Sequence, residues 1–534
     1  MSRPPDDAQM PLSEPAPVMS DFGKWMALTA ALLGWLFDGA EMGLFSMVGR
    51  AAIQDLLEFG SVPTKEQEGT IGLYFGVVIA VFLVGAATGG VLFGWLGDRI
   101  GRVRAMSLSV LTYAVFTGLC GVVVAPWQIA VLRFIASLGM GGEWSLGVAL
   151  VMEVWPNRSR GLMAGLIGAA ANVGYLLVGV VGLGLSATLL HVERWLTATG
   201  LSESLVSALV AYKGWRLMMI LGCAPALLTF FFRLFVPESA KWEHERGKGA
   251  TTHWATRDLV GVIVGALGPG LIIFVWASSF PHWSTRAVVL TRIAASLVGL
   301  VVVTLGYLWP VTRYVKRYAA LGGMTADGSR HVIRQMLLAA GLSGIALLGT
   351  WASTQWAPTW ASKLTGGAQN SREYAQIWLA VGACVGTIAA ALAGDRFGRR
   401  ITYFFMCLGS LASALWLFIM NDKYGAAFLA STFVAGAFTA SFYGWLPLYL
   451  PELFETKVRA TGQGFGFNFG RIFAAVGALQ GGVLTGMFPN DEVVLGVTIR
   501  GGYPLACSAM SLIYLLGMAV IWLAPETKGK PLPD

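Results

Sequence analysis

Two acidic residues lie inside the first long apolar run of the sequence. Asp38 and Glu41 occur in the stretch GWLFDGAEMG, within an apolar run that extends from about Trp25 to Val48. On a helix they would be separated by about 4.5 Å along the axis and about 60° around it, so both can face one cavity. Neighbouring buried carboxyls are suited to exchanging a proton near neutral pH. The alternative is a structural acid that is satisfied by an arginine or by backbone groups.

Three further ionisable residues lie within apolar runs. Arg133 lies about 9 Å below the end of its run, so its guanidinium can reach a carboxylate or extend to the membrane surface. Arg471 lies about 15 Å inside its run, too deep to extend comfortably. With Asn468 one turn earlier, Arg471 is the best candidate to clamp an anionic substrate, although a structural ion pair is an alternative. Glu143, in GGEW, is a candidate second proton site or gate element.

Amide and aromatic side chains in the apolar runs can line a site for a sugar acid. Most Trp and Tyr residues of membrane proteins form interface belts or pack, so each of these residues is a weak candidate by itself. Asn172 is the strongest, because it lies in the middle of a run and matches Asn468 in an internal repeat. The candidate substrate-binding residues are therefore Arg471, Asn468, Asn172, Tyr175, Gln355, Trp356 and Tyr443.

The composition is that of a protein that crosses a membrane many times. Of the 534 residues, 56% are hydrophobic and 12% are charged, whereas soluble domains carry roughly a quarter charged residues. Stretches of about 20 apolar residues, long enough to cross a hydrocarbon core of ~30 Å, recur along the chain. We predict spans near residues 25–48, 71–96, 104–125, 127–151, 162–190, 214–236, 259–280, 287–309, 335–360, 374–394, 401–420, 425–450, 462–487 and 501–524.

The positive charges alternate between the two sides of these spans. With the N-terminus in the cytoplasm, inner segments hold 23 lysines and arginines and outer segments hold 9. This bias predicts that both termini are cytoplasmic, and it accounts for the net charge of +8 without a nucleic-acid partner.

The sequence contains an internal repeat. GDRIGR at 97–102 returns as GDRFGR at 394–399, NVG at 172–174 as NFG at 468–470, and PES at 237–239 as PET at 525–527. Two six-span halves with a two-span insertion account for these matches. The predicted parts are an N-tail (1–24), an N-terminal half (25–240), the insertion (241–334), a C-terminal half (335–526) and a C-tail (527–534).

The repeated loops resemble the signature loops of the major facilitator superfamily. GWLGDRIGRVR, AGDRFGRR, VPES and APET carry this resemblance, which covers nearly the whole chain. GWLFDGAEMG, GMGGEW, EVWPNRSRG and PELFETKVRATGQGFGFNFGR are similar to the organic-acid and sugar-acid proton symporters. The two extra spans resemble those of bacterial sialic-acid transporters. The resemblance implies an all-α polytopic membrane protein with the major facilitator fold and 14 transmembrane helices.

Paired charges flank the repeated loops. Glu153 precedes Arg160 by seven residues, and Glu452 precedes Arg459 by seven residues, so pairs can form across nearby inner loops. The resemblance implies a gate that is locked when the carrier faces outward, whereas plain topology anchoring is the alternative for the arginines. The candidate gating residues are Asp98, Arg102, Glu153, Arg160, Asp395, Arg399, Glu452 and Arg459.

Several functions have no support in the sequence. No phosphate-binding loop of the form GxxxxGK[ST] occurs, no metal-ligand spacing is present, and no catalytic triad is visible, so neither ATP-driven transport nor an enzyme is expected. We expect a proton-coupled importer of an organic acid, most simply sialic acid or a similar sugar acid, without a cofactor. Asp38, Glu41, Arg133 and Glu143 would couple the proton. The expected setting is a monomer in the inner membrane, whose partners are the small anion, the proton and the bilayer.

Three alternatives remain open at this stage. The first is a proton symporter of another monocarboxylate, such as lactate, pyruvate or an aromatic acid. The second is a facilitator or exporter of the same fold, against which the lack of proline in the fifth predicted span counts. The third is a membrane sensor that binds a ligand without transporting it.

Overall fold

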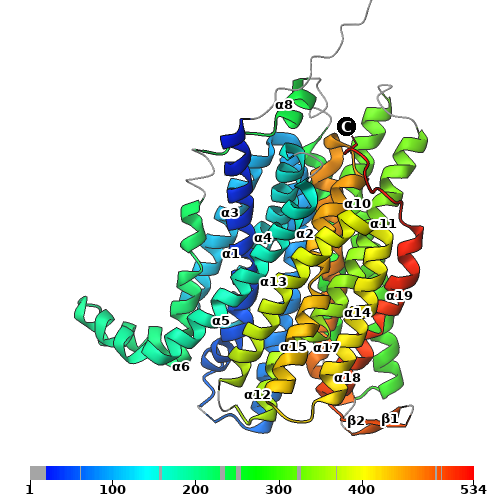
Figure 1. Ribbon diagram of the computed structural model, residues 1–534. Coiled ribbons are helices and arrows are strands. Elements are labelled where there is room, and N and C mark those ends of the chain that lie inside the picture. Colours follow the sequence, from blue (N-terminus) through cyan, green and yellow to red (C-terminus); the bar gives the residue numbers. More distant parts are fainter. Residues whose placement is uncertain are drawn as a thin grey trace, which may run out of the picture.

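The computed structural model describes residues 20–533 apart from 61, 156–158, 229–234, 248–253, 279, 321–325, 368–369, 488–489 and 495. Long helices run side by side through most of the molecule (Figure 1). One end of the bundle carries the loops at 97–102 and 394–399 and the C-terminus, and is called the motif side below. The other end carries a short β-hairpin and is called the hairpin side.

The first half begins with long apolar helices whose ends follow local capping rules. Thr64 and Gln67 form a capping box at the start of α2, and Gly101, at φ 114°, ends it. Pro126 begins α4, where the missing N–H costs nothing. The helices are α1 (Asp21–Leu56), α2 (Lys65–Ile100), α3 (Arg102–Leu119), α4 (Pro126–Val154), α5 (Arg160–Ala198) and α6 (Glu203–Leu221).

The second half contains more interrupted helices than the sequence predicts. The predicted spans near 335–360, 425–450 and 501–524 are each divided between two helices. At the first break Ser353 leaves helical geometry (φ −125°, ψ −89°), within a run of polar residues. The helices are α11 (Ala326–Trp351), α12 (Ala357–Leu364), α13 (Ser371–Phe397), α14 (Arg399–Met420), α15 (Ala426–Thr439), α16 (Phe442–Tyr449), α17 (Arg459–Met487), α18 (Tyr503–Ser511) and α19 (Ile513–Val520).

The number of spans agrees with the prediction of fourteen. Thirteen stretches of the described residues are long and apolar enough to cross a membrane, and α17, with 29 residues, occupies the predicted span near 462–487. Near the sixth predicted span (214–236), α6 begins at Glu203 and breaks at Ala211–Gly214, where Tyr212, Lys213 and Gly214 have positive φ. Residues 229–234 of that span lie outside the described residues. An unpredicted antiparallel hairpin, β1 (Glu492–Val494) and β2 (Val497–Ile499), precedes α18.

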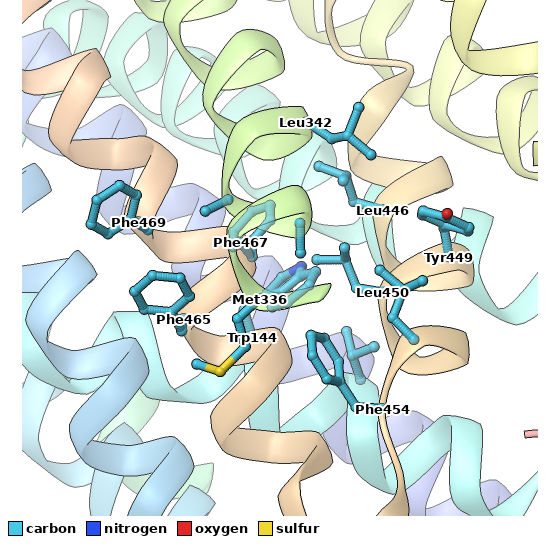
Figure 2. Packing of buried hydrophobic residues seen from close by; sticks show 14 of the residues in the cluster. Trp144, Met336, Leu342, Leu446, Tyr449, Leu450, Phe454, Phe465, Phe467 and Phe469 are labelled. Carbon is cyan, nitrogen blue, oxygen red and sulfur yellow. The ribbon is translucent and has the colours of Figure 1, made fainter. Parts of the chain in front are cut away.

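The two halves meet along two seams. On one, α2 packs against α17; on the other, α5 packs against α13. Helices also approach each other closely within one half. A Cβ added to Gly141 of α4 would lie 1.9 Å from the carbonyl oxygen of Ala86 on α2, so only glycine fits there. The largest apolar cluster joins both halves, and in it Trp144 stacks on Phe467 with ring centroids 3.8 Å apart (Figure 2). The interface between the halves is therefore a packed core on the motif side.

The insertion contributes one short helix and two long helices, and the long helices pack against both halves. Its helices are α8 (Ala240–Gly247), α9 (Leu259–Ala277) and α10 (Thr285–Ala320). The long helices α9 and α10 pack against each other, and α9 contacts α2 and α17. The hydroxyls of Tyr307 on α10 and Thr88 on α2 share a buried hydrogen bond of 2.6 Å. Ile263, Leu267 and Phe274 of α9 are more than 60% exposed and face outward, as lipid contact requires.

Candidate functional site: a central cavity and a closed gate

A cavity lies between the two halves, near the middle of the bundle. The space inside it, counted together with its openings, is about 770 Å³. Residues of α1, α5, α11, α13, α15, α16 and α17 line it. The lining includes Trp35, Asp38, Met42, Asn172, Tyr175, Leu347, Thr350, Trp351, Thr354, Gln355, Leu379, Thr439, Tyr443 and Arg471.

Asp38 and Arg471 are the charged residues of this lining, one from each half. Both side chains are almost fully buried, at 2% exposure each. Within the described part of the chain, neither carboxylate oxygen of Asp38 accepts a hydrogen bond, and Nη1 of Arg471 donates none. The guanidinium of Arg471 lies over the ring of Phe467, 5.4 Å from its centroid. Buried charged atoms without partners are costly, and these atoms have hydrogen-bonding capacity that the described residues do not use.

Glu41 does not face the cavity with Asp38, contrary to the expectation from their spacing. Its carboxylate forms an ion pair with Arg133 of α4 and accepts a hydrogen bond of 2.6 Å from the hydroxyl of Thr117 on α3. The rings of Phe82 and Phe45 hold the guanidinium of Arg133, at 4.3 and 5.1 Å. The 60° between the two acids around α1 is enough to direct Asp38 toward the second half and Glu41 into the first.

Glu143 is buried between α4 and α1 without a hydrogen-bond partner in the described structure. A Cβ on Gly34 of α1 would lie 1.6 Å from Oε1 of Glu143, so the carboxyl fits against that glycine. Glu143 and Asp38 are electrostatic neighbours. Of these three acids, Glu41 is neutralised by Arg133, whereas Asp38 and Glu143 have no hydrogen-bond partner among the described residues.

The predicted polar residues divide into those at the cavity and those away from it. Asn172, Tyr175, Gln355 and Tyr443 line the cavity, whereas Trp356 lines a smaller neighbouring cavity. Asn468 is fully buried outside both linings and donates to the carbonyls of Gly141 and Gly464, at 2.9 and 3.1 Å. Asn468 therefore lies where α17 crosses α4.

Sequence reasoning missed four cavity residues, Thr350, Trp351, Thr354 and Thr439. The hydroxyls of Thr354 and Thr439 lie 3.1 Å apart, and Thr350 donates to the carbonyls of Ala346 and Thr439. A signal was present for two of them, because Thr350 and Thr354 are one helical turn apart inside a predicted span.

The motif side of the bundle is closed by contacts between the halves. Glu153 of α4 pairs with Arg459 of α17 at 3.2 Å and with Arg102 at 3.3 Å, all three side chains being fully buried. Asp98 pairs with Arg102 at 2.6 Å and accepts a bond of 2.9 Å from the backbone N–H of Thr461 in the first turn of α17. The carboxylate of Asp98 therefore sits at the positive end of a helix from the other half.

The equivalent residues of the second half pair among themselves. Arg399 donates to both oxygens of Glu452, at 2.6 and 3.0 Å, and lies 3.6 Å from Asp395. The side chain of Asp395 is 42% exposed, unlike that of Asp98. Arg160, which belongs to the first half, is an electrostatic neighbour of Glu452, but its Nε has no hydrogen-bond partner among the described residues. The two repeats thus hold the same residues in different arrangements.

The PES and PET sequences cap the helices that follow the repeated loops. Glu238 accepts from the backbone N–H groups of Arg102 and Val103, and Glu526 accepts from those of Arg399 and Arg400. Burial raises the pKa of Glu238 above the usual glutamate range, and its hydrogen bonds offset only part of this effect. For Glu526 burial is outweighed by four backbone N–H donors, so its pKa is lowered.

Comparison with known proteins agrees with this architecture. The model of the sugar (and other) transporter family matches residues 26–262 and 324–534, and so passes over most of α9 and α10. The chain is 24% identical to a cis,cis-muconate transport protein of Acinetobacter baylyi, covering 92% of this chain and 94% of that protein. It is 22% identical to a sialic acid transporter of Escherichia coli (strain K12), covering 89% of each.

Solved structures have the same fold. A proton:xylose symporter of the major facilitator superfamily superimposes with a TM-score of 0.63 and 19% identity, covering 95% of this chain and 97% of that one. A human organic anion transporter gives a TM-score of 0.57 and 14% identity, covering 93% and 99%. The chain therefore belongs to the sugar (and other) transporter family, has the fold of the major facilitator superfamily, and is a multi-pass membrane transporter and not an enzyme.

Proposed function

We propose that this chain is a proton-coupled symporter that imports a small organic acid. The observation that carries the proposal is the pair formed by Asp38 and Arg471, buried at one cavity from opposite halves and lacking hydrogen-bond partners at both carboxylate oxygens and at Nη1. An arginine fork suits a carboxylate ligand. A carboxylic acid buried beside it can hold the transported proton.

Charge balance gives the coupling a physical reason. The empty cavity holds one negative and one positive side chain, so its net charge is zero. A substrate carboxylate on Arg471 would leave an extra negative charge in a medium of low dielectric constant, unless Asp38 takes up a proton. The empty and the fully loaded cavities are therefore both neutral, which favours one proton per monocarboxylate. Glu41 is already neutralised by Arg133, so Asp38 is the titrating acid in this scheme, with Glu143 as a second proton site.

The direction of access follows from the closed motif side. The contacts of Glu153 and Asp98 with α17 join the halves there, while the cavity lies toward the hairpin side. With both termini in the cytoplasm, as the charge bias predicts, this arrangement is closed toward the cytoplasm. Rocking of the N-terminal half (25–240) against the C-terminal half (335–526) would break these contacts and open the cavity inward. Asp98, Arg102, Glu153 and Arg459 would form the gate between the halves. Asp395, Arg399 and Glu452 would support it from the second repeat, and Arg160 from the first half, beside Glu452.

The lining favours a compact, largely apolar acid over a highly hydroxylated one. Asn172 donates to the carbonyl of Gly168, Gln355 to the hydroxyl of Tyr175, and Thr354 is bonded to Thr439, so these groups are already engaged. Trp35, Trp351 and Tyr443 offer flat apolar faces. An unsaturated or aromatic acid therefore stands as a candidate beside the sialic-acid-like sugar acid that the sequence motifs favour. Sugar acids would require the amides to exchange partners.

Uptake into proteoliposomes tests the proposal. N-acetylneuraminate, cis,cis-muconate, nicotinate and lactate are offered with and without an inward proton gradient. We expect at least one acid to accumulate only with the gradient. Asp38→Asn should abolish accumulation but keep exchange of internal for external acid, and Arg471→Gln should abolish both. Asp55→Asn is the matched control, because Asp55 pairs with Arg216 outside the cavity linings.

Three outcomes would contradict this function. Uptake that is unchanged when the gradient is collapsed would indicate a facilitator. Binding of an acid without any flux would indicate a sensor. Full activity of Arg471→Gln would remove the assigned carboxylate site.

A further inference from the structure

A second, smaller cavity lies next to the central one, toward the hairpin side. Its open volume is about 450 Å³. Tyr175, Trp351 and Gln355 line both cavities, so the two share a wall. The lining of this outer cavity is Ser46, Phe75, Ile79, Tyr175, Trp351, Gln355, Trp356, Pro358, Thr359, Arg372 and Gln376.

Arg372 is the charged residue of the outer cavity. It lies on the first turn of α13, is half-buried, and donates through Nη2 to the backbone carbonyl of Ser46 on α1. Within the described residues no ion pair involves Arg372, although Glu373 follows it in the chain and Arg50 is an electrostatic neighbour. A guanidinium has five N–H donors, so one carbonyl leaves most of its hydrogen-bonding capacity unused.

The wall between the cavities is a hydrogen-bonded pair from opposite halves. Nε2 of Gln355 donates to the hydroxyl of Tyr175 at 2.8 Å, and Nε2 of Gln376 donates to the backbone carbonyl of Tyr175 at 3.2 Å. Breaking the first of these bonds would connect the outer cavity, with Arg372, to the central cavity, with Arg471. Arg372 and Arg471 thus lie in neighbouring cavities that the Tyr175–Gln355 pair separates.

We propose that the outer cavity is a second binding subsite, which takes the carboxylate of an organic anion on Arg372 before it passes the Tyr175–Gln355 pair. The chemistry of recognition is a guanidinium for the carboxylate and aromatic faces, from Phe75, Trp351 and Trp356, for the carbon skeleton. The subsite deepens the function proposed above and rests on it for the identity of its ligand. Its preference for anions does not depend on that function.

Reagents of opposite charge measure this preference directly. Thr359 lines the outer cavity, and Thr359→Cys supplies a reporter thiol there, with the signal of the unmodified chain subtracted. The reporter is treated with a sulfonate-bearing and with a trimethylammonium-bearing methanethiosulfonate. We expect Arg372→Gln to lower the ratio of anionic to cationic reaction rates about fivefold, which is the size of a single nearby charge in a partly hydrated site.

Matched variants separate a charge effect from a structural one. Arg372→Lys should keep most of the ratio, because it keeps the charge. Lys363→Gln and Arg471→Gln should leave it unchanged, because Lys363 lies over the ring of Tyr503 and Arg471 lines the central cavity. An unchanged ratio in Arg372→Gln, or an equal fall in Lys363→Gln, would overturn the proposal.

Protection by a simple carboxylate gives the second measurement. Benzoate should slow modification of the reporter thiol in the otherwise unmodified chain and in Arg471→Gln, but not in Arg372→Gln. Absence of protection while Arg372 is present would refute the subsite. These readouts need no transport, so they differ from a failure of the proposed function, which appears as missing gradient-driven uptake in proteoliposomes.

Discussion

Replacing Arg459 by glutamine should open the motif side of the transporter. Arg459 donates to the carbonyl of Phe454 at 3.2 Å and to the hydroxyl of Thr456 at 3.0 Å, and both partners belong to its own half. Its bond of 3.2 Å to Glu153 is the contact that crosses to the other half. When the halves separate on this side, the local bonds persist and the bond to Glu153 is lost. Among these bonds of Arg459, the one to Glu153 is thus the one that favours the closed arrangement.

The size of the effect follows from that one bond. A hydrogen bond between charged groups contributes about 1.5–3 kcal/mol, and about 1.4 kcal/mol changes an equilibrium tenfold. Arg459→Gln should therefore raise the population that is open on the motif side by about 10- to 150-fold. Complete opening is not expected, because Asp98 still accepts from Thr461, and Gln463 still donates to the carbonyl of Ser145.

A buried cysteine reports the opening. Ser145 of α4 is fully buried against α17, so Ser145→Cys reacts with N-ethylmaleimide only when the two helices part. Its reaction rate should rise with Arg459→Gln in proportion to the open population. Lys457→Gln is the loop control, because Lys457 pairs locally with Glu455. Arg399→Gln should lower thermal stability without raising the rate, because its partner Glu452 belongs to the same half. An unchanged rate in Arg459→Gln, or an equal rise in Arg399→Gln, would refute the reasoning.

Three stability measurements on purified protein follow from the caps and the helix contacts. The pKa of Glu526 is lowered, so its ionised form stabilises the fold above the usual glutamate pKa. This stabilisation is lost on acidification. The Tm of Glu526→Gln should therefore lie below that of the unmodified protein at pH 7, and the difference should shrink at pH 4. Glu238, with its raised pKa, should give the opposite trend, because its contribution is lost as the pH rises. Gly141→Ala should lower Tm by several degrees, since its Cβ would overlap a carbonyl, whereas Gly341→Ala, with open space around its Cβ, should not. Tyr307→Phe should cost about 0.6–1.7 kcal/mol, measured by unfolding in detergent.

The spans and the repeat were accessible from the sequence because they depend on local composition. An apolar run of about 20 residues must be a helix in a bilayer, since unpaired backbone groups are too costly there. The repeated GDR loops placed Asp98 and Arg102 at one end of the bundle without any knowledge of packing. The breaks at Ser353 and at Tyr212 were not predicted, because hydropathy indicates that a segment spans the membrane but not where its helix breaks.

The contacts between side chains were less accessible, because they depend on how each helix rotates against its neighbours. The spacing of Asp38 and Glu41 allowed a shared cavity, but packing turned Glu41 toward Arg133. Asn468 matched Asn172 in the repeat. Asn468, however, donates to the backbone of α4 where α17 crosses it, whereas Asn172 lines the cavity. Sequence symmetry therefore identified positions, whereas the roles diverge with the environment of each half.

The inserted pair of helices makes the protein unequal toward its lipids. On the flank where α2 meets α17, α9 lies against both helices, and its exposed residues Ile263, Leu267 and Phe274 form a new lipid-facing surface outside that seam. On the opposite flank, α5 meets α13, and in the described structure neither makes extensive contact with α9 or α10. The insertion therefore shields the seam of α2 with α17, whereas it does not shield the seam of α5 with α13 in the described structure. We expect changes in membrane thickness or fluidity to reach the two seams unequally.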